Sequence, residues 1–223
     1  MGVVPWWAKP ADLAGVIDHT ILRPEAGRAD VLRFCEEART HRFCSVCVNP
    51  IFVPLVAGAL SGSGVLTCSV IGFPFGAIPT PLKAAEAAWV VAQGADEVDM
   101  VLALGPMKDG DDDAVRADIA GVKRACGAAT LKVILETCLL TEAEIVRACQ
   151  LSQAAGADFV KTSTGYSKGG ATTADVALMR RTVGDSMGVK ASGGIRTFAD
   201  AESMLRAGAT RIGASAGITI IAG

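Results

Sequence analysis

Ala155-Gly-Ala-Asp-Phe-Val-Lys161 is the stretch that decides the fold, because it closes one helical pattern and opens a strand. Similar phrases occur at Gln93-Gly-Ala-Asp96 and Ala207-Gly-Ala-Thr210, and their glycines lie 62 and 52 residues from that of the central phrase. If each interval holds two strand–helix units, one unit takes about 26 to 31 residues, the length of a β-α pair. The sequence therefore predicts a regular succession of such units.

Short apolar strand candidates alternate with longer helical patterns along the whole chain. A capping box at Thr141-Glu-Ala-Glu144, an N-cap at Thr197 and a stop at Gly184 mark helix ends. Eight strands are expected, at residues 15–18, 43–48, 65–71, 97–102, 131–135, 159–161, 189–191 and 211–213.

This alternation predicts an α/β chain folded as a single (β/α)8 barrel over residues 1–223, and an open doubly wound sheet is the alternative. A short extra segment with Trp6 and Trp7 precedes the first strand, where it could plug the barrel or contact another subunit.

The composition excludes several classes of partner. The chain has 223 residues, a net charge of −2, 51% hydrophobic residues and 25 glycines, which suit one large core rather than a nucleic-acid or membrane surface. No apolar run reaches the roughly 18 residues of a membrane span. Because the first residues also lack the features of a signal peptide, we expect a cytoplasmic location.

Seven scattered cysteines and two histidines give little support for a metal or redox site. Cys44-Ser-Val-Cys47 has C-x-x-C spacing, but it lies in a predicted strand, where positions three apart point to opposite faces. We therefore expect a structural role for this pair and no bound metal.

Two lysines end apolar strands and are followed by loops of glycines and hydroxyls. Lys161 precedes Thr162-Ser-Thr-Gly165, and Lys190 precedes Ala191-Ser-Gly-Gly194. Desolvation and a neighbouring positive charge both favour a neutral amine, which can attack a carbonyl to form a Schiff base. Glycine-rich loops present backbone N–H groups to anions. The pattern indicates a phosphorylated carbonyl substrate.

Charged residues also occupy strand positions that barrels normally fill with branched apolar residues. Glu97 and Asp99 share one face of their strand, Lys132 and Glu136 share one face of the next, and Asp18 ends the first. If these faces point inward, the barrel contains interleaved acids and amines. A salt-bridge network that only satisfies itself is the alternative, although buried ion pairs stabilise weakly.

A phosphate site is expected after the seventh and eighth strands, its usual place in such barrels. The loops there are Ser192-Gly-Gly194 and Gly213-Ala-Ser-Ala-Gly217, and the second opens a short helix.

The chain resembles the deoxyribose-phosphate aldolases, and the matching phrases run nearly end to end. They are Ile17-Asp-His-Thr20, Ser45-Val-Cys-Val-Asn-Pro50, Val70-Ile-Gly-Phe-Pro-Phe-Gly76, Glu97-Val-Asp-Met100, Leu131-Lys-Val-Ile-Leu-Glu-Thr137, Asp158-Phe-Val-Lys-Thr-Ser-Thr-Gly165, Val189-Lys-Ala-Ser-Gly-Gly194 and Arg211-Ile-Gly-Ala-Ser215.

This resemblance implies a (β/α)8 class I aldolase without metal or organic cofactor, acting in deoxyribose catabolism. Such enzymes reversibly cleave 2-deoxy-D-ribose 5-phosphate into acetaldehyde and D-glyceraldehyde 3-phosphate. It also implies a homo-oligomer, a dimer or a tetramer. Lys161 is implied as the Schiff-base lysine, Lys190 as its positive neighbour and a proton-transfer group, and Asp99 as the acid/base carboxylate. The implied substrate-binding residues are Asp18, Cys47, Thr164, Gly165, Gly193, Gly194, Gly213 and Ser215.

Two departures from the resemblance fall at the phosphate end. Tyr166 replaces a lysine and Ala216 replaces a serine that some members carry, so we expect backbone N–H groups to make most of the contacts that bind the phosphate. Three other functions remain open: a Schiff-base lyase for another sugar phosphate, a phosphate-dependent isomerase, and a barrel that binds sugar phosphate without turnover.

Overall fold

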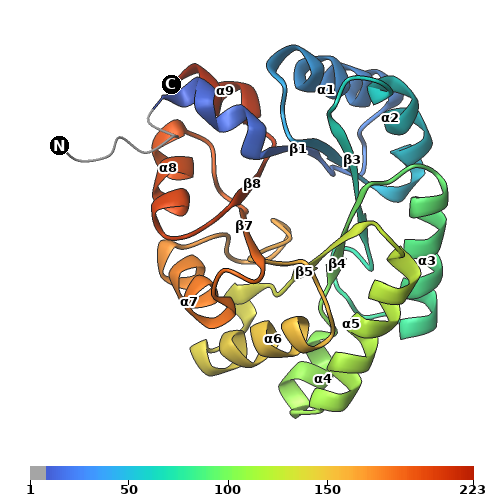
Figure 1. Ribbon diagram of the computed structural model, residues 1–223, viewed down its shortest axis with the longest axis vertical. Coiled ribbons are helices and arrows are strands. Elements are labelled where there is room, and N and C mark those ends of the chain that lie inside the picture. The colour runs from blue at the N-terminus through green and yellow to red at the C-terminus, as the bar shows by residue number, and fades with distance from the viewer. Residues whose placement is uncertain (1–8) are drawn as a thin grey trace.

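Eight parallel strands close into a barrel in the order β1 to β8, each hydrogen-bonded to its neighbours in sequence. The computed structural model describes residues 9–223, and Figure 1 shows the strands at the centre of a ring of helices. The strands are β1 (Ile17–Ile21), β2 (Ser45–Val48), β3 (Leu66–Ile71), β4 (Glu97–Val101), β5 (Thr130–Ile134), β6 (Phe159–Lys161), β7 (Gly188–Ser192) and β8 (Arg211–Ala214). The predicted (β/α)8 barrel is confirmed, and the open sheet is ruled out.

Helices fill the intervals between the strands. They are α1 (Arg28–His41), α2 (Val53–Leu60), α3 (Thr80–Ala92), α4 (Leu104–Asp109), α5 (Asp112–Cys126), α6 (Glu142–Ala154), α7 (Thr173–Val183), α8 (Phe198–Arg206) and α9 (Gly217–Ala222), with short 3-10 turns η1 (Pro10–Val16), η2 (Pro50–Phe52) and η3 (Thr137–Leu139). Thr141 and Thr197 cap α6 and α8, and Gly184 ends α7, all as predicted. In residues 9–223, no helix is long and apolar enough to cross a bilayer.

The first strand begins later than the sequence pattern indicated. Gly15 belongs to η1, whose first position is Pro10, a residue that fixes the helical φ angle. The prediction that Asp18 ends the first strand is therefore wrong, because Asp18 is its second residue. Trp6 and Trp7 lie outside the described residues, whereas η1 lies against α9 with Leu13 buried (Figure 1).

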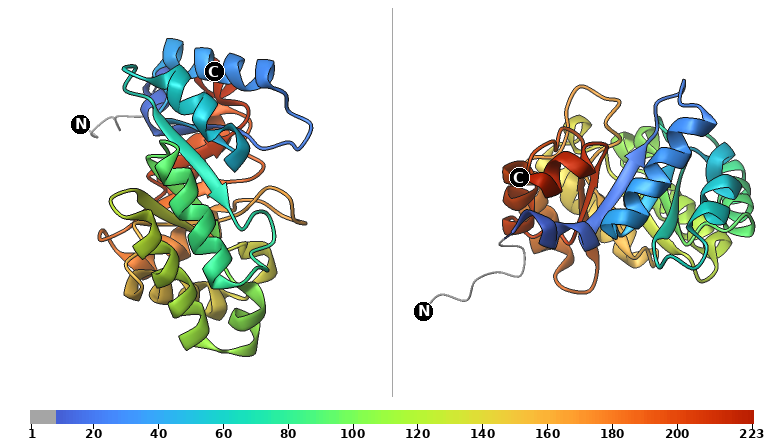
Figure 2. Two further views of the ribbon diagram at one scale, coloured as in Figure 1. Left: turned by 90° about the vertical axis from the view of Figure 1, so that its right-hand side faces the viewer. Right: turned by 90° about the horizontal axis from the view of Figure 1, so that it is seen from above.

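Successive side chains along each strand point alternately outward, toward the helices, and inward, into the barrel. Outward-facing side chains such as Val98, Met100 and Val133 pack with the helices in the main hydrophobic core. Inside the barrel, a small apolar cluster of Leu22, Cys47, Cys68 and Val70 occupies one part, and charged side chains occupy another. Figure 2 shows loops after β1, β3 and β6 projecting from the same side of the barrel.

Candidate active site

Asp99 stands at the centre of the charged part of the barrel. Its Oδ1 atom accepts a hydrogen bond from Lys132 Nζ at 2.8 Å, and the same ammonium contacts Glu97 Oε2 at 2.6 Å. Lys132 and Asp99 are fully buried and are partners in the β4–β5 register. Both acids of β4 therefore point inward.

Lys161 and Lys190 lie side by side on β6 and β7, where they are register partners. Each Nζ atom donates to Asp99 Oδ2 at 2.8 Å. Lys190 also contacts Asp18 Oδ2 at 2.5 Å, whereas Asp99 is the one ion-pair partner of Lys161 among residues 9–223. Lys161, which lines the pocket, therefore has fewer ion-pair partners than Lys190.

The buried acids decide which of these groups are ionised. Burial disfavours the Lys190 ammonium, but Asp18 and Asp99 outweigh it and raise the pKa of Lys190 above its usual range. Burial likewise opposes ionisation of Asp99, but Lys132, Lys161 and Lys190 hold its pKa well below the usual range. Lys190 is therefore an ammonium matched by acids, rather than an uncompensated positive charge beside Lys161.

Arg211 completes the charged set from the first position of β8. Its Nη1 atom donates to Asp18 Oδ1 at 2.7 Å and to Glu97 Oε2 at 2.9 Å. We call these seven side chains the interior cluster: Asp18, Glu97, Asp99, Lys132, Lys161, Lys190 and Arg211.

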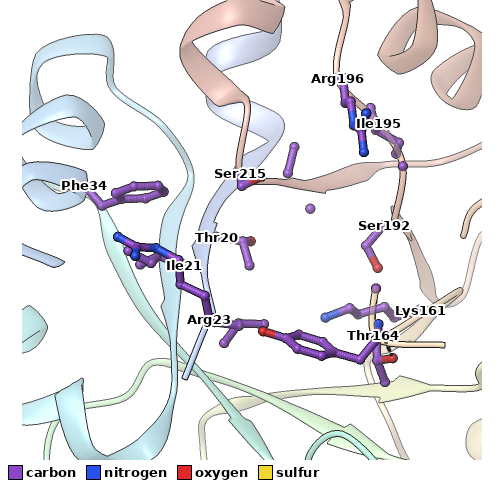
Figure 3. A pocket seen from close by; sticks show the side chains of 17 residues that line it. Thr20, Ile21, Arg23, Phe34, Lys161, Thr164, Ser192, Ile195, Arg196 and Ser215 are labelled. Atoms are coloured by element: carbon purple, nitrogen blue, oxygen red, sulfur yellow. Dashed lines mark hydrogen bonds between the residues drawn. The ribbon is translucent and has the colours of Figure 1, made fainter. Parts of the chain in front are cut away.

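A cavity of about 360 Å³ opens above Lys161. Six of the residues predicted to bind substrate line it: Thr164, Gly165, Gly193, Gly194, Gly213 and Ser215. Figure 3 shows Lys161 at one end of this pocket and Arg196 and Ser215 at the other. Asp18 and Cys47, by contrast, are fully buried below the pocket and are not among its described lining residues.

The described lining of the pocket is basic. It contains Lys161, Arg23 and Arg196 and no acidic side chain. Gly193 and Gly194 have left-handed φ angles of 92° and 82°, a conformation that costs glycine little. Because basic side chains and a glycine turn both suit an anion, the end of the pocket away from Lys161 fits a phosphate group.

Glu136 shapes the loop after β6 instead of joining the interior cluster. It lies beyond the end of β5 with a φ angle of 56°, so the predicted inward face shared with Lys132 is wrong. Its carboxylate accepts hydrogen bonds from the backbone N–H and the hydroxyl of Thr164. Thr164 Oγ1 in turn accepts from the N–H of Tyr166 at 3.0 Å. These bonds fix the loop that carries Gly165.

The loops after β6 and β7 approach each other at two glycines. A Cβ atom on Gly170 would lie 2.3 Å from the carbonyl oxygen of Gly193, a contact that only glycine avoids. Nearer the opening, the rings of Phe73 and Tyr166 meet edge to face, 5.4 Å between centroids. The aromatic pair joins the loops after β3 and β6 beside the pocket.

The sulfur and carboxylate atoms of Cys47, Cys68 and Asp99 come within 4.8 Å of one another and could in principle surround a metal ion. Asp99 already accepts from three ammonium groups, and Lys132 lies 3.4 Å from the Cys68 sulfur. A cation would be repelled by these neighbours, so the donor set does not favour a metal. Burial also raises the pKa of Cys44 to about 11, which leaves it a poor partner for redox chemistry with Cys47.

Three basic side chains of the pocket and the interior cluster escaped the sequence analysis. Arg23 and Arg196 both follow strand ends. Arg196 comes directly after the glycine pair on which the predicted phosphate site was centred, and the loop that carries Arg23 was not considered for that site. Arg211 was treated as the start of a strand, although its alternation with Gly213 places it on the inward face. Arg211 could have been found by asking, for every charged residue in a strand, whether the alternation of side chains points it into the barrel.

Comparisons with known proteins agree with this geometry. Residues 13–223 match the model of the DeoC/LacD family aldolases. The chain is 66% identical over 212 residues to the deoxyribose-phosphate aldolase of Rhodospirillum rubrum, covering 95% of this chain and 89% of the relative. It is 58% identical to that of Bacillus subtilis, covering 95% of each.

A solved structure gives the same result in three dimensions. The tetrameric deoxyribose phosphate aldolase of Aeropyrum pernix superposes with a TM-score of 0.90 at 38% identity, covering 98% of this chain and 93% of that one. The chain belongs to the DeoC/LacD family of aldolases.

Proposed function

We propose that this chain reversibly cleaves 2-deoxy-D-ribose 5-phosphate into acetaldehyde and D-glyceraldehyde 3-phosphate through a Schiff base on Lys161. The observation that carries the proposal is the position of this lysine. Its amine lies at the floor of a basic pocket and hydrogen-bonds to a carboxylate that Lys190 shares. Names of the relatives support the choice of substrate.

The neutral Lys161 amine attacks the C1 aldehyde, and the carbinolamine loses water to give an iminium ion. Lys190 is protonated in the resting site and hydrogen-bonds to the same Asp99 oxygen, so it can donate the proton that the departing water needs and becomes neutral in that step. Asp99 is ionised in the resting site, because the surrounding ammonium groups hold its pKa low, and its carboxylate stabilises the positive iminium.

Cleavage then breaks the bond between C2 and C3. The C3 hydroxyl loses its proton, through a water molecule, toward Asp99, and the C3 atom becomes the aldehyde of glyceraldehyde 3-phosphate. The electron pair of the broken bond moves into the iminium to form an enamine. Asp99 returns its proton to the enamine carbon through the water, and hydrolysis of the resulting iminium ion releases acetaldehyde, restores the Lys161 amine and returns a proton to Lys190.

The phosphate group would lie at the far end of the pocket. In this proposal the backbone N–H groups of Gly165, Gly193, Gly194 and Ser215 bind it, helped by the Ser215 hydroxyl, and Arg23 and Arg196 add positive charge. The helix that follows, α9, has only six residues, so its dipole contributes little and the loop groups carry the binding.

Borohydride trapping tests the proposal. The purified chain is incubated with 2-deoxyribose 5-phosphate, reduced, digested and mapped by mass spectrometry, and a reduced two-carbon adduct is expected on the Lys161 peptide. Glyceraldehyde 3-phosphate is measured in parallel by a coupled assay. Adduct on Lys190 or Lys132 would reassign the nucleophile. Binding with neither adduct nor product would support a non-catalytic barrel, and isomerised sugar without adduct would support an isomerase.

A substrate panel separates this aldolase from a Schiff-base lyase for another sugar phosphate. We expect the highest kcat/KM with 2-deoxyribose 5-phosphate, the substrate that the names of the relatives indicate. A larger kcat/KM with a 2-hydroxylated or a bisphosphorylated sugar would overturn the substrate assignment.

The proposal includes a cytoplasmic homo-oligomer. A phosphorylated sugar does not cross a bilayer unaided, which fits a cytoplasmic enzyme. Leu82 and Trp89 lie two helical turns apart on α3, 59% and 46% exposed, and Phe75 in the loop that precedes α3 is 76% exposed. These side chains suit a contact between copies. Light scattering of the purified chain gives the subunit number, and a monomer at micromolar concentration would contradict this part.

A further inference from the structure

Arg211 lies below the lysines and outside the pocket lining, but its contacts lead to the nucleophile. Its guanidinium is 12% exposed and lies 5.4 Å above the ring of Phe159. Nη1 bridges two carboxylates, Asp18 Oδ1 at 2.7 Å and Glu97 Oε2 at 2.9 Å. A planar guanidinium held by two acids and a ring is fixed in place, so its charge has a defined position.

The next link is the carboxylate of Asp18. Its Oδ1 atom accepts from Arg211 and from Ser45 Oγ at 2.7 Å each. This leaves Oδ2 to face Lys190 at 2.5 Å. Lys190 and Lys161 then both donate hydrogen bonds to Oδ2 of Asp99. One continuous path therefore joins Arg211 to the proposed nucleophile.

The charges of the interior cluster do not cancel when all groups carry their usual charge. Four cations face three carboxylates. A net charge in a buried site is costly, so loss of one proton from one cation balances the cluster. Arg211 cannot supply that proton, because a guanidinium does not deprotonate in proteins.

The two other lysines are also unsuited to lose it. Acids surrounding Lys132 and Lys190 outweigh burial and raise the pKa of both. Lys161 has one ion-pair partner among the described residues, shares it with Lys190, and faces the pocket. It is the cation that loses least by becoming neutral.

Three thiols also face the cluster and belong in the charge count. Burial raises the pKa of Cys44 to about 11 and also raises that of Cys68, so both are neutral. A hydrogen bond from Cys68 lowers the pKa of Cys47. We count Cys47 as a thiol, and the experiment below tests that count.

We propose, building on the aldolase function above, that Arg211 is a positioning residue whose permanent charge, acting through Asp18 and Lys190, makes Lys161 the group that gives up its proton. Without Arg211, three cations face three carboxylates, and the cluster balances with Lys161 protonated. Glu97 has the opposite effect, because its removal leaves a larger positive excess.

The test is the pH dependence of borohydride-trapped acetaldehyde adduct on Lys161. Arg211→Met should move the acid limb of this profile about one pH unit toward alkaline pH, as expected for one charge in a partly shielded interior. Glu97→Gln should move it toward acid pH, and the double variant should bring it back toward the wild-type position. Arg211→Lys, which keeps the charge, should stay close to wild type. Arg206→Gln, at an exposed ion pair of α8, is the matched control and should leave the profile unchanged.

The outcomes separate this inference from the aldolase function. A wild-type chain that forms no adduct at any pH contradicts the proposed function itself. A wild-type chain that forms adduct, with variants that lower its amount at every pH without moving the limb, refutes only the role of Arg211. An acid shift in Cys47→Ser would show that a thiolate was counted wrongly and would overturn the charge balance. If Arg211→Met does not fold, as judged by circular dichroism, Arg211→Lys and Glu97→Gln still decide the question.

Discussion

Lys161 and Lys190 donate to the same oxygen atom, Oδ2 of Asp99, each at 2.8 Å. The two lysines are register partners on β6 and β7, so the closed barrel itself sets their separation. The proposed nucleophile and the proposed proton donor therefore share one carboxylate oxygen. In the proposed reaction, both the attack by Lys161 and the proton transfer from Lys190 depend on Asp99.

Asp99→Asn should lower kcat by about 10² to 10⁴-fold, the usual contribution of general acid–base groups, with a much smaller change in KM. An amide cannot neutralise the iminium ion, and its NH₂ group would oppose the ammonium groups that now donate to the carboxylate. Steady-state kinetics at pH 7 provide the measurement. Asp113→Asn, at an exposed position of α5, serves as the control. A raised KM with unchanged kcat would mean that Asp99 only binds substrate.

Activity and folding should have separate pH dependences. The folded pKa values of Asp18 and Asp99 are depressed, so their contribution to stability is present above the unfolded pKa and is lost as the pH falls through the folded value. The folded pKa of Lys190 is raised, so its contribution is present below the unfolded pKa and is lost as the pH rises through the folded value. Between about pH 5 and pH 9 these contributions are nearly constant.

We therefore expect an acid limb in kcat/KM within this range to be accompanied by an intact fold, because the buried acids do not titrate there. Circular dichroism and initial rates, measured in the same buffers, give the comparison. Loss of ellipticity in parallel with loss of rate would attribute the limb to unfolding and remove the argument.

The phosphate end offers a third test. Arg196→Gln should raise KM for 2-deoxyribose 5-phosphate roughly tenfold, since a hydrogen bond to a charged group contributes about 1.5 to 3 kcal/mol and this side chain is exposed. Arg23→Gln should have a smaller effect, because ion pairs with Glu25 and Asp30 already engage its guanidinium. KM for unphosphorylated deoxyribose should not change in either variant. Equal changes for both substrates would mean that these arginines support the loop rather than the phosphate.

The fold was readable from the sequence because the local signals repeat. The Gly-Ala-Asp phrases end helices and begin strands, and all eight strands were found, with small errors at their ends. The first strand was misplaced because the apolar residues of η1 resemble a strand over so short a distance. Strand boundaries depend on hydrogen bonds to other segments, which local patterns do not contain.

The site was readable only in part, for a geometric reason. Because side chains alternate between the two faces of a strand, the sequence alone places Glu97 and Asp99 on the same face of β4, and Lys132 can be assigned to one face of β5 in the same way. Which acid meets which amine depends on the stagger of the closed barrel, which brings Arg211 of β8 to Glu97 of β4. Glu136 was misassigned because β5 ends two residues before it and its backbone turns left-handed.

A buried ion pair outside the barrel gives the last prediction. Lys83 of α3 is fully buried, and its Nζ atom donates to Asp118 Oδ2 of α5 at 2.6 Å and to the carbonyl of Val101 at 3.0 Å. Thr80 Oγ1 donates to the other oxygen of Asp118 at 2.7 Å. The pair therefore joins two helices to the end of the strand that carries Asp99.

Lys83→Met should lower the free energy of unfolding by about 3 to 5 kcal/mol, because it leaves the Asp118 carboxylate buried without its cation. Lys83→Met with Asp118→Leu should recover most of that loss, since an apolar pair of similar volume avoids the desolvation of both charges. Urea unfolding at pH 7 measures both, and Lys108→Met is the control, because the Lys108–Glu144 pair is exposed and should cost about 1 kcal/mol or less. A double variant as unstable as the single one would show that the ion pair contributes to α3–α5 packing through its shape and hydrogen bonds, and that the unpaired charge is not the cause of the loss.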